Sequence, residues 1–298
     1  QDVRAGASLS EAMDNHPACF SSLLRYTVRA GEGSGNLDTI FSQMAEHFER
    51  QLELQQRIKA GTRYPIFILG VFVIVLLVIF VFILPQFQTI FGQYEAKLPA
   101  LTRIVIGFSD FLVTHIFAIL AGIVVLVIGI TAGLKTEKGG WLRDRLTLRL
   151  PLLGPLVRQL ITARFARTLA LLGDSGVSWV QALELCGQAS GNRVVDGEIQ
   201  RIADAVVSGS SLSQELHNHP LFPRMLARMT AAGEATGNLS ELLVRVADYY
   251  TNETQKRIDG LLSLLEPTLL VLIGAVVTFV AFSVYLPVFK LGTALGGG

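Results

Sequence analysis

Charged residues are scarce in this sequence, and three long stretches have none. Asp, Glu, Lys and Arg make up 16% of its 298 residues, whereas soluble domains average about 25%. Residues 64–84, 111–134 and 267–286 contain none of the four. A helix needs about 20 residues to cross the hydrocarbon core of a bilayer, and each stretch is that long. The sequence therefore predicts three transmembrane helices and argues against a soluble protein.

The sequence also has few cysteines and a formal net charge close to zero. The two cysteines, Cys19 and Cys186, have no C-x-x-C partner, which argues against a disulfide framework and favours small buried side chains. The formal net charge is +1, so we expect no nucleic-acid partner. The first charge-free stretch follows 63 mixed residues and lacks the cleavage pattern of a signal peptide. The charge-free stretches are therefore not signal peptides, and a nucleic-acid-binding protein is disfavoured.

Most of the positive charges beside the predicted spans lie on one side of the membrane. Short flanking segments that are rich in Lys and Arg stay in the cytoplasm. Residues 1–63 and 135–266 are therefore expected in the cytoplasm, and the segments 85–110 and 289–298 on the far side. The flanking charges that decide this are Arg57, Lys59, Arg63, Lys135, Lys138, Arg143, Arg145, Arg149, Lys256 and Arg257. The far side carries only Lys97, Arg103 and Lys290.

The sequence contains an internal repeat. The segment Gly6–Pro17 matches Gly209–Pro220 at a separation of 203 residues, which becomes 202 after a one-residue slip. The match continues from a polar segment to the end of a predicted span. It therefore indicates a duplicated unit in which soluble helices are followed by a membrane helix. The later matches pair Gly31 with Gly233, Glu32 with Glu234, Gly35 with Gly237, Asn36 with Asn238, Pro65 with Pro267 and Pro85 with Pro287.

The two copies differ in length at their beginning. Residues 141–208 of the second copy have no counterpart in the first, which begins at Gln1. We therefore expect that roughly 60 or more residues of the repeat unit precede Gln1 in the parent protein.

Both copies are predicted to be helical. Ser8 with Glu11 and Ser211 with Gln214 fit the capping box of a helix N-terminus, and Asn36 and Asn238 are candidate N-caps of the next helix. Apolar residues then recur at helical spacing in each copy, and no segment shows the period-two alternation of a strand. The apolar positions are Leu37, Ile40, Phe41, Met44 and Phe48 in the first copy and Leu239, Leu242, Leu243, Val246 and Tyr250 in the second.

These observations predict an all-α polytopic membrane protein with two repeated cytoplasmic helical-bundle domains and three transmembrane helices. The predicted segments are a first soluble domain without its front (1–63), spans at 64–84, 111–134 and 267–288, a connection at 85–110, a second soluble domain (135–266) and a short tail (289–298).

Three short motifs resemble catalytic, phosphate-binding or metal-binding sequences, but each lacks the residues or the context that such a site needs. Gly173-Asp-Ser175-Gly176 resembles a serine-protease nucleophile segment, but it interrupts a helical pattern and is typical of a helix–helix turn. Gly31–Gly35 lacks the Gly-Lys-Ser/Thr of a phosphate-binding loop. His217 and His219 have no further ligands at zinc spacing and precede Pro220, so they are read as a turn. We predict no catalytic residue, no cofactor and no metal site, and hence no enzyme.

Three carboxylates leave alternatives open. Glu32 and Glu234 each follow the same repeated glycine, either as turn carboxylates that bond nearby backbone donors or as charged contacts for a cytoplasmic partner. Glu266 precedes Pro267 at the start of the third span. Its negative charge either interacts favourably with the dipole at a helix N-terminus or contacts a neighbouring membrane helix. Other ionisable groups are nearly absent from the spans, His115 near one end excepted. A small transporter or channel therefore stays only as the alternative function, since it would need a polar pathway.

The order of these motifs resembles the type II secretion F family, which includes the inner-membrane platform proteins of type IV pili. The resemblance covers the whole chain apart from the missing front of the first domain. It is carried by the paired Gly-Glu-x-x-Gly-Asn-Leu segments, by Tyr64-Pro65 and Glu266-Pro267 where spans start, by Leu84-Pro85 and Leu286-Pro287 where they end, and by Phe165-Ala-Arg167, Ser175-Gly-Val177 and Ala182-Leu183.

The resemblance implies a homo-oligomeric platform in the bacterial inner membrane, with the far side being the periplasm. Its implied partners are a cytoplasmic hexameric assembly ATPase, pilins or pseudopilins, other inner-membrane subunits of the machine, and membrane lipid. We expect ATPase motion to act on charged cytoplasmic side chains, namely Arg25, Arg29, Glu32, Arg228 and Glu234. The prolines at the span boundaries would then pass the movement to helices that contact pilin.

Overall fold

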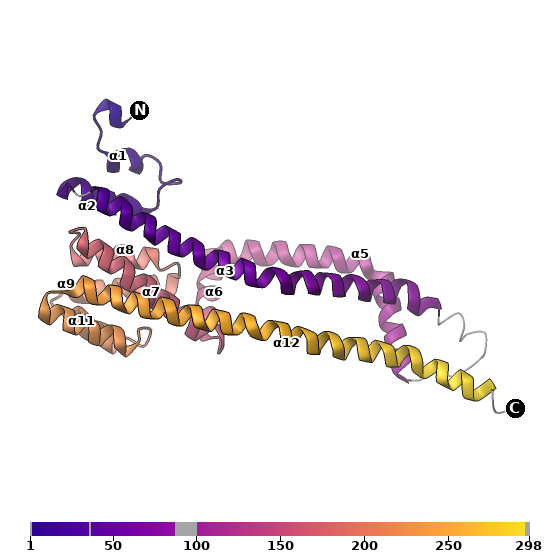
Figure 1. Ribbon diagram of the computed structural model, residues 1–298. Helices are drawn as coiled ribbons and strands as arrows, with labels where there is room; N and C mark the ends of the chain where they lie inside the picture. Colours follow the sequence, from indigo (N-terminus) through magenta and orange to yellow (C-terminus); the bar gives the residue numbers. More distant parts are fainter. Residues whose placement is uncertain (1, 36, 87–99, 296–298) are drawn as a thin grey trace. The chain divides into compact units, whose positions relative to one another are not determined.

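Every regular element that the structure describes is a helix. The computed structural model describes residues 2–35, 37–86 and 100–295, and no strand occurs in these ranges. The chain divides into two compact units, one formed by Gln1–Gln56 with Gly133–Ile258 and the other by Arg57–Ala132 with Asp259–Gly298. The all-α prediction is confirmed for the described residues (Figure 1).

The helices follow one another with short connections. The first copy contains a 3-10 turn at Val3–Ala5, α1 (Leu9–Asp14), α2 (Ser22–Ser34) and α3 (Leu37–Val78), which continues as a π-helical segment over Ile79–Ile83. The remainder contains α5 (Ala100–Lys135), α6 (Glu137–Arg149), α7 (Leu153–Asp174), α8 (Trp179–Ala189), α9 (Arg193–Val207), α10 (Leu212–Asn218), α11 (Arg224–Thr236) and α12 (Leu239–Leu295).

The sequence repeat is also a structural repeat, in which α1, α2 and α3 correspond to α10, α11 and α12. Ser8 and Ser211 cap α1 and α10, and Ser8 forms the complete capping box with Glu11. α1 packs on α2, and α10 packs on α11. Gly35 and Gly237 end α2 and α11 with φ of 74° and 75°. This left-handed conformation favours glycine, which explains why both copies have it there.

We call the unit formed by Gln1–Gln56 and Gly133–Ile258 the soluble unit. Its core is centred on α7. This helix buries residues around its whole circumference, including Phe165, Leu169 and Leu172. Residues of α8, α9, α10, α11 and α12 belong to the same buried cluster. A helix that buries residues on all sides needs neighbours on all sides. Leu23, Ile40 and Met44 of the first copy belong to the cluster as well, so residues of both copies pack in one bundle around α7.

The repeated apolar stripe contributes to the buried cluster around α7 from both copies, and more completely from the second. Leu243 and Tyr250 of α12 lie in this cluster, and so do Ile40 and Met44 of α3. Phe41 and Phe48, which correspond to Leu243 and Tyr250, are 42% and 41% exposed. The prediction of a packed apolar stripe therefore describes Ile40 and Met44 of α3 but not Phe41 and Phe48.

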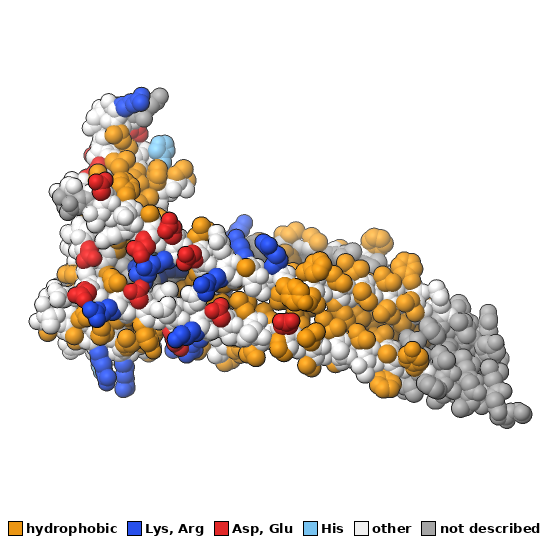
Figure 2. Space-filling view, in the orientation of Figure 1, with side chains coloured by type: hydrophobic (Ala, Val, Ile, Leu, Met, Phe, Trp, Pro, Cys, Tyr) orange, Lys and Arg blue, Asp and Glu red, His pale blue; other side chains and the backbone are white. Residues whose placement is uncertain are grey.

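Three helical stretches are long and apolar enough to cross a membrane. They are Leu37–Gln86, Phe117–Lys135 and Leu239–Ser283, and each contains one of the predicted charge-free runs or most of it. Almost none of the side chains in their apolar windows is buried within the chain. On the face shown in Figure 2, apolar side chains cover the apolar stretches of these helices, and most of the charged side chains lie on the remaining helices and on the parts of α3 and α12 that precede those stretches. Exposed apolar surface of this length is what a lipid environment would cover.

Two of these helices pass through a proline without interruption. Pro65 lies inside α3, and Pro267 lies inside α12 together with Pro287. The expectation that Glu266 stands at a helix N-terminus is wrong, because α12 is continuous from Leu239 to Leu295 and Glu266 is exposed in its interior. A proline removes the hydrogen bond to the carbonyl four residues earlier and crowds that carbonyl with its ring, but the helical turns on both sides keep the backbone helical here. Pro85 follows the π-helical segment in a helical turn.

Candidate functional site

The repeated glutamates hold the two short helices in place. Glu32 lies in the last turn of α2, and its carboxylate accepts hydrogen bonds from the N–H groups of Leu9, at 2.5 Å, and Ser10, at 3.1 Å. Glu234 likewise accepts from the N–H groups of Leu212, at 2.9 Å, and Ser213, at 3.4 Å. These donors belong to the first turns of α1 and α10, which have no partner inside their own helix.

Of the two alternatives for Glu32 and Glu234, the contacts in the structure match the first, in which each carboxylate accepts hydrogen bonds from backbone N–H groups. The donors are not in the same turn, however, but 22 to 23 residues earlier for Glu32. The Ser10 side chain lowers the pKa of Glu32, and the N–H groups of Ser10 and Leu9 and the charge of Arg29 lower it further, against the effect of burial. The charged form of the glutamate is thus the one that the fold uses.

The glycine before each glutamate allows two helices to approach closely. A Cβ at Gly233 would lie 2.7 Å from the Cα of Leu239, the first residue of α12. A Cβ at Gly31 would lie 2.5 Å from Cδ1 of Ile40. Asn36 lies outside the described residues, and Asn238 directly precedes α12, where its carbonyl accepts from the N–H of Leu242. In the Gly-Glu-x-x-Gly-Asn-Leu motif, the glycine thus allows close approach of the helix that follows, and the glutamate binds the first turn of the helix that precedes.

The charged residues predicted to meet a partner differ in what they contact within the chain. Arg25 and Arg29 both pair with Asp14 of α1, Arg25 at 2.7 Å. Arg228 is exposed on α11, and Glu266 is exposed on α12. The structure therefore gives internal roles to Arg25 and Arg29, as it does to Glu32 and Glu234. Arg228 is the exposed arginine among the predicted partner contacts for which we propose a partner below.

A second polar cluster lies where α3 meets α7 and α12 in the soluble unit. Asp248 accepts from Arg50 at 3.0 Å and from Arg167 at 2.6 Å. Burial alone would raise the pKa of Asp248, but its bonds to Arg167 and Arg50 and their charges lower it. Glu46, which corresponds to Asp248 in the first copy, also pairs with Arg50. One arginine of the first copy thus holds the equivalent carboxylates of both copies.

This cluster borders a small cavity. The cavity has a volume of about 160 Å³ and is lined by Gln43, Glu46, His47, Arg50, Arg167, Leu171, Asp174 and Val244. Burial, with the charges of Arg164 and Arg167, lowers the pKa of His47 to about 4, so its ring is neutral at pH 7. Its Nε2 lies 2.9 Å from the amide nitrogen of Gln51. Sequence reasoning missed this cluster, although the Phe-Ala-Arg motif contains Arg167.

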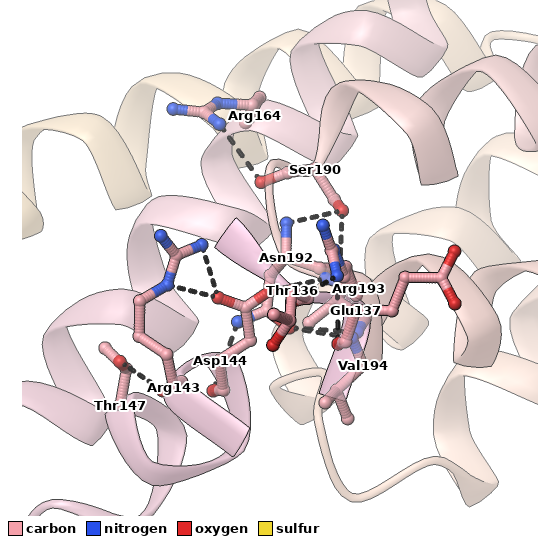
Figure 3. A network of polar contacts seen from close by, with 11 residues as sticks. Thr136, Glu137, Arg143, Asp144, Thr147, Arg164, Ser190, Asn192, Arg193 and Val194 are labelled. Carbon is pink, nitrogen blue, oxygen red and sulfur yellow. Dashed lines mark hydrogen bonds and ion pairs between the residues drawn. The ribbon is translucent and has the colours of Figure 1, made fainter. Parts of the chain in front are cut away.

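A third network fastens α6 to the turn between α8 and α9 (Figure 3). Asp144 of α6, whose side chain is only 5% exposed, accepts from the guanidinium of Arg143 and, at 3.0 Å, from the N–H of Arg193. The amide of Asn192 donates to the carbonyl of Asp144, and its oxygen caps α9. Arg193 donates to the carbonyl of Glu137 at 2.9 Å. We call Asp144, Asn192 and Arg193 the α6 clamp.

The α6 clamp gives a stability prediction. Asp144→Asn removes the charge from a buried acceptor of three N–H donors, so we expect a loss of about 1–2 kcal/mol of unfolding free energy. Urea unfolding of the soluble unit can be followed by Trp179 fluorescence in a Trp141→Phe background. The control is Glu137→Gln, since the Glu137 side chain is exposed and extends away from the clamp (Figure 3). Equal midpoints for the two variants would contradict the role given to Asp144.

The motifs that resembled catalytic or metal sites serve the fold. Gly173 and Asp174 end α7, Ser175 and Gly176 begin the turn to α8, and the Ser175 hydroxyl donates to the carbonyl of Leu171. His219 pairs with Glu198 at 2.9 Å. Within the described ranges, no three His, Cys, Asp or Glu side chains are grouped so that they could hold a metal. Cys19 is exposed and Cys186 is buried, and burial raises the pKa of the Cys186 thiol.

Comparison with known proteins places this architecture in a family. The family model described as type II secretion system (T2SS), protein F matches residues 1–85 and 165–287. This chain belongs to the type II secretion system protein F family. The two matched ranges hold both copies of the Gly-Glu motif and both of the helices that pass from soluble unit to span, α3 and α12. Residues 86–164, with α5, α6 and the start of α7, lie outside the match.

Relatives in this family come from two kinds of machine. The chain is 34% identical over 296 residues to the type IV pilus assembly protein TapC of Aeromonas hydrophila, covering 99% of this chain and 72% of that one. It is 37% identical over 291 residues to the type IV pilus assembly protein PilC of Thermus thermophilus, covering 97% and 71%. It is 33% identical over 299 residues to the type II secretion system protein F of Pseudomonas aeruginosa, covering 99% and 73%.

Proposed function

We propose that this chain is a platform subunit of the bacterial inner membrane that couples a cytoplasmic assembly ATPase to the extraction of pilin or pseudopilin helices. The observation that supports this most is the combination of family membership with two soluble modules, each continuous with a membrane-spanning helix. The machine is a type IV pilus or a type II secretion system, as it is for the relatives. The platform works as a homo-oligomer and has no catalytic step of its own.

The proposed topology puts residues 1–63 and 135–266 in the cytoplasm and 85–110 and 289–298 in the periplasm. The positive charges beside the spans support it. The exposed Cys19 tests it, because the thiol of Cys186 is buried. A membrane-impermeant maleimide is expected to label one cysteine per chain in inverted vesicles and none in intact spheroplasts, as read by mass spectrometry. Labelling of Cys19 in spheroplasts would contradict the orientation.

The proposed mechanism is mechanical. A helix is a rigid element that rises about 1.5 Å per residue, and α3 and α12 lead from the soluble modules into spans without a loop. Movement of a soluble module by the ATPase would therefore reach the membrane helices directly. We propose that Glu266 contacts a neighbouring membrane helix, since it is exposed just before the apolar part of α12.

Photocrosslinking at Arg228 tests the coupling. A photoreactive residue at position 228 is expected to give adducts with an assembly ATPase in intact cells, identified by mass spectrometry. The matched control is position 201, another exposed arginine on a different helix, α9, whose side chain is 76% exposed. ATPase adducts at 228 and not at 201 would support the proposed contact. Equal adducts at both positions, or none at 228, would count against this surface as the ATPase contact.

A further inference from the structure

Helix α6 turns an unusual face outward. Its buried side consists of Gly140, Asp144 and Leu148, spaced four residues apart. On the other side Leu142 and Leu146 are 54% and 52% exposed, and Trp141, at the edge between the two sides, is 43% exposed. Leu150, Leu152 and Leu153, which follow the helix, are exposed as well. A contiguous group of large apolar side chains on a surface marks a place that something else covers.

The same outward side is basic. Lys138, Arg143, Arg145 and Arg149 are all exposed, whereas of the two acidic residues of α6 only Glu137 is exposed and Asp144 is buried in the α6 clamp. The Arg145 guanidinium lies over the Trp141 ring, 4.8 Å from its centre. Basic side chains interspersed with exposed tryptophan and leucine can place their apolar stems and rings among acyl chains while their charged ends reach the headgroups.

The position of α6 in the chain favours lipid over a protein partner as the covering. The membrane-spanning stretch Phe117–Lys135 of α5 ends one residue before α6, and that residue, Thr136, caps α6. The α6 clamp holds the opposite side of the helix to the α8–α9 turn. The outward side therefore follows the membrane-spanning stretch directly, and its leucines Leu142 and Leu146 are exposed.

We propose that the outward face of α6 lies in the surface of the bilayer. Trp141, Leu142 and Leu146 would sit at the boundary between headgroups and acyl chains, and Lys138, Arg145 and Arg149 would bind the phosphates of acidic phospholipids. The soluble unit would then be attached to the membrane surface through α6 and the α6 clamp, in addition to its continuous helices. This inference rests on α5 spanning the membrane, and it does not depend on the ATPase.

The two tryptophans of the chain make the test direct. Trp141 and Trp179 are the only ones, and they are similarly exposed, at 43% and 38%. The full chain is placed in nanodiscs of phosphatidylcholine and phosphatidylglycerol, with or without bromine on the acyl chains. With Trp179→Phe, brominated lipid is expected to quench Trp141 by at least about twofold, as for an interfacial indole. With Trp141→Phe, Trp179 is expected to stay unquenched.

A second probe on the same helix tests the outward side directly. Leu146 lies opposite the buried residues Gly140, Asp144 and Leu148, so Leu146→Trp in the Trp141→Phe, Trp179→Phe background is expected to be quenched at least as strongly as Trp141. Arg145→Gln with Arg149→Gln is expected to reduce the quenching of Trp141, and removal of phosphatidylglycerol is expected to do the same.

Two results would overturn the proposal. One is quenching of Trp141 no stronger than that of Trp179. The other is protection of Trp141 from aqueous acrylamide without quenching by brominated lipid, which would show that a protein surface covers α6. Either result would leave the ATPase contact at Arg228 to be judged by its own crosslinking experiment, so the two proposals fail separately.

Discussion

Phe165→Ala is expected to cost about 3–5 kcal/mol of unfolding free energy in the soluble unit. Phe165 is 2% exposed at the centre of α7, and its ring lies 4.9 Å from that of Phe222, between centroids. Removing the ring deletes buried apolar surface and leaves a cavity among helices that are held on several sides, so collapse can fill only part of it. This is the largest effect that we expect from any single truncation in the chain.

The measurement is urea unfolding of the full chain in detergent micelles, followed by the fluorescence of Trp179 in a Trp141→Phe background. Trp179 reports on this bundle because its ring lies against Gly173 of α7, where a Cβ would come within 2.4 Å of it. Val207→Ala is the control, since Val207 is 66% exposed on α9. A loss at Phe165 no larger than at Val207 would mean that α7 is not the centre of the core.

Gly233→Ala is expected to destabilise the soluble unit by about 2 kcal/mol, although alanine is the better helix former by about 1 kcal/mol. The added methyl group would lie 2.7 Å from the backbone of Leu239. A backbone atom cannot rotate away, so α12 itself would have to shift. Such a shift would disturb Leu243 and Val246, which are fully buried a turn or two further on.

Gly31→Ala is the matched control, because it makes the same change at the equivalent position of the first copy. There the nearest atom is the end of the Ile40 side chain, 2.5 Å away, which can move. We therefore expect a loss of less than about 1 kcal/mol for Gly31→Ala. Urea midpoints of both variants decide the matter, and a larger loss at Gly31 than at Gly233 would contradict the explanation.

The roles of the repeated glutamates show where sequence reasoning stops. The sequence placed Glu32 and Glu234 at equivalent positions and offered backbone donors or a partner as alternatives. It could not show that the donors are the first turns of α1 and α10, because that contact joins residues about 22 positions apart. A repeated glutamate paired with a repeated capping serine was the available signal.

The α6 clamp and the Arg50 cluster had no sequence signal of comparable strength. Asp144 looks like one more charge in a basic helix until its burial is seen. Arg50 and Asp248 are 198 residues apart, and neither belongs to a motif. Both sites depend on which helices become neighbours, which no local pattern records.

The sequence by itself determined the helices, their caps, the three spans and the duplication, because charge-free length, 3.6-residue periodicity and capping residues act over a few turns of one chain segment. Tertiary structure alone decided which apolar faces are covered. Leu243 and Phe41 occupy equivalent positions, yet Leu243 lies in the cluster around α7 and Phe41 is 42% exposed, because the neighbours that cover a helix face come from distant parts of the chain. It also decided that Glu266 stands inside a continuous helix, because the surrounding turns of α12 hold the backbone through Pro267.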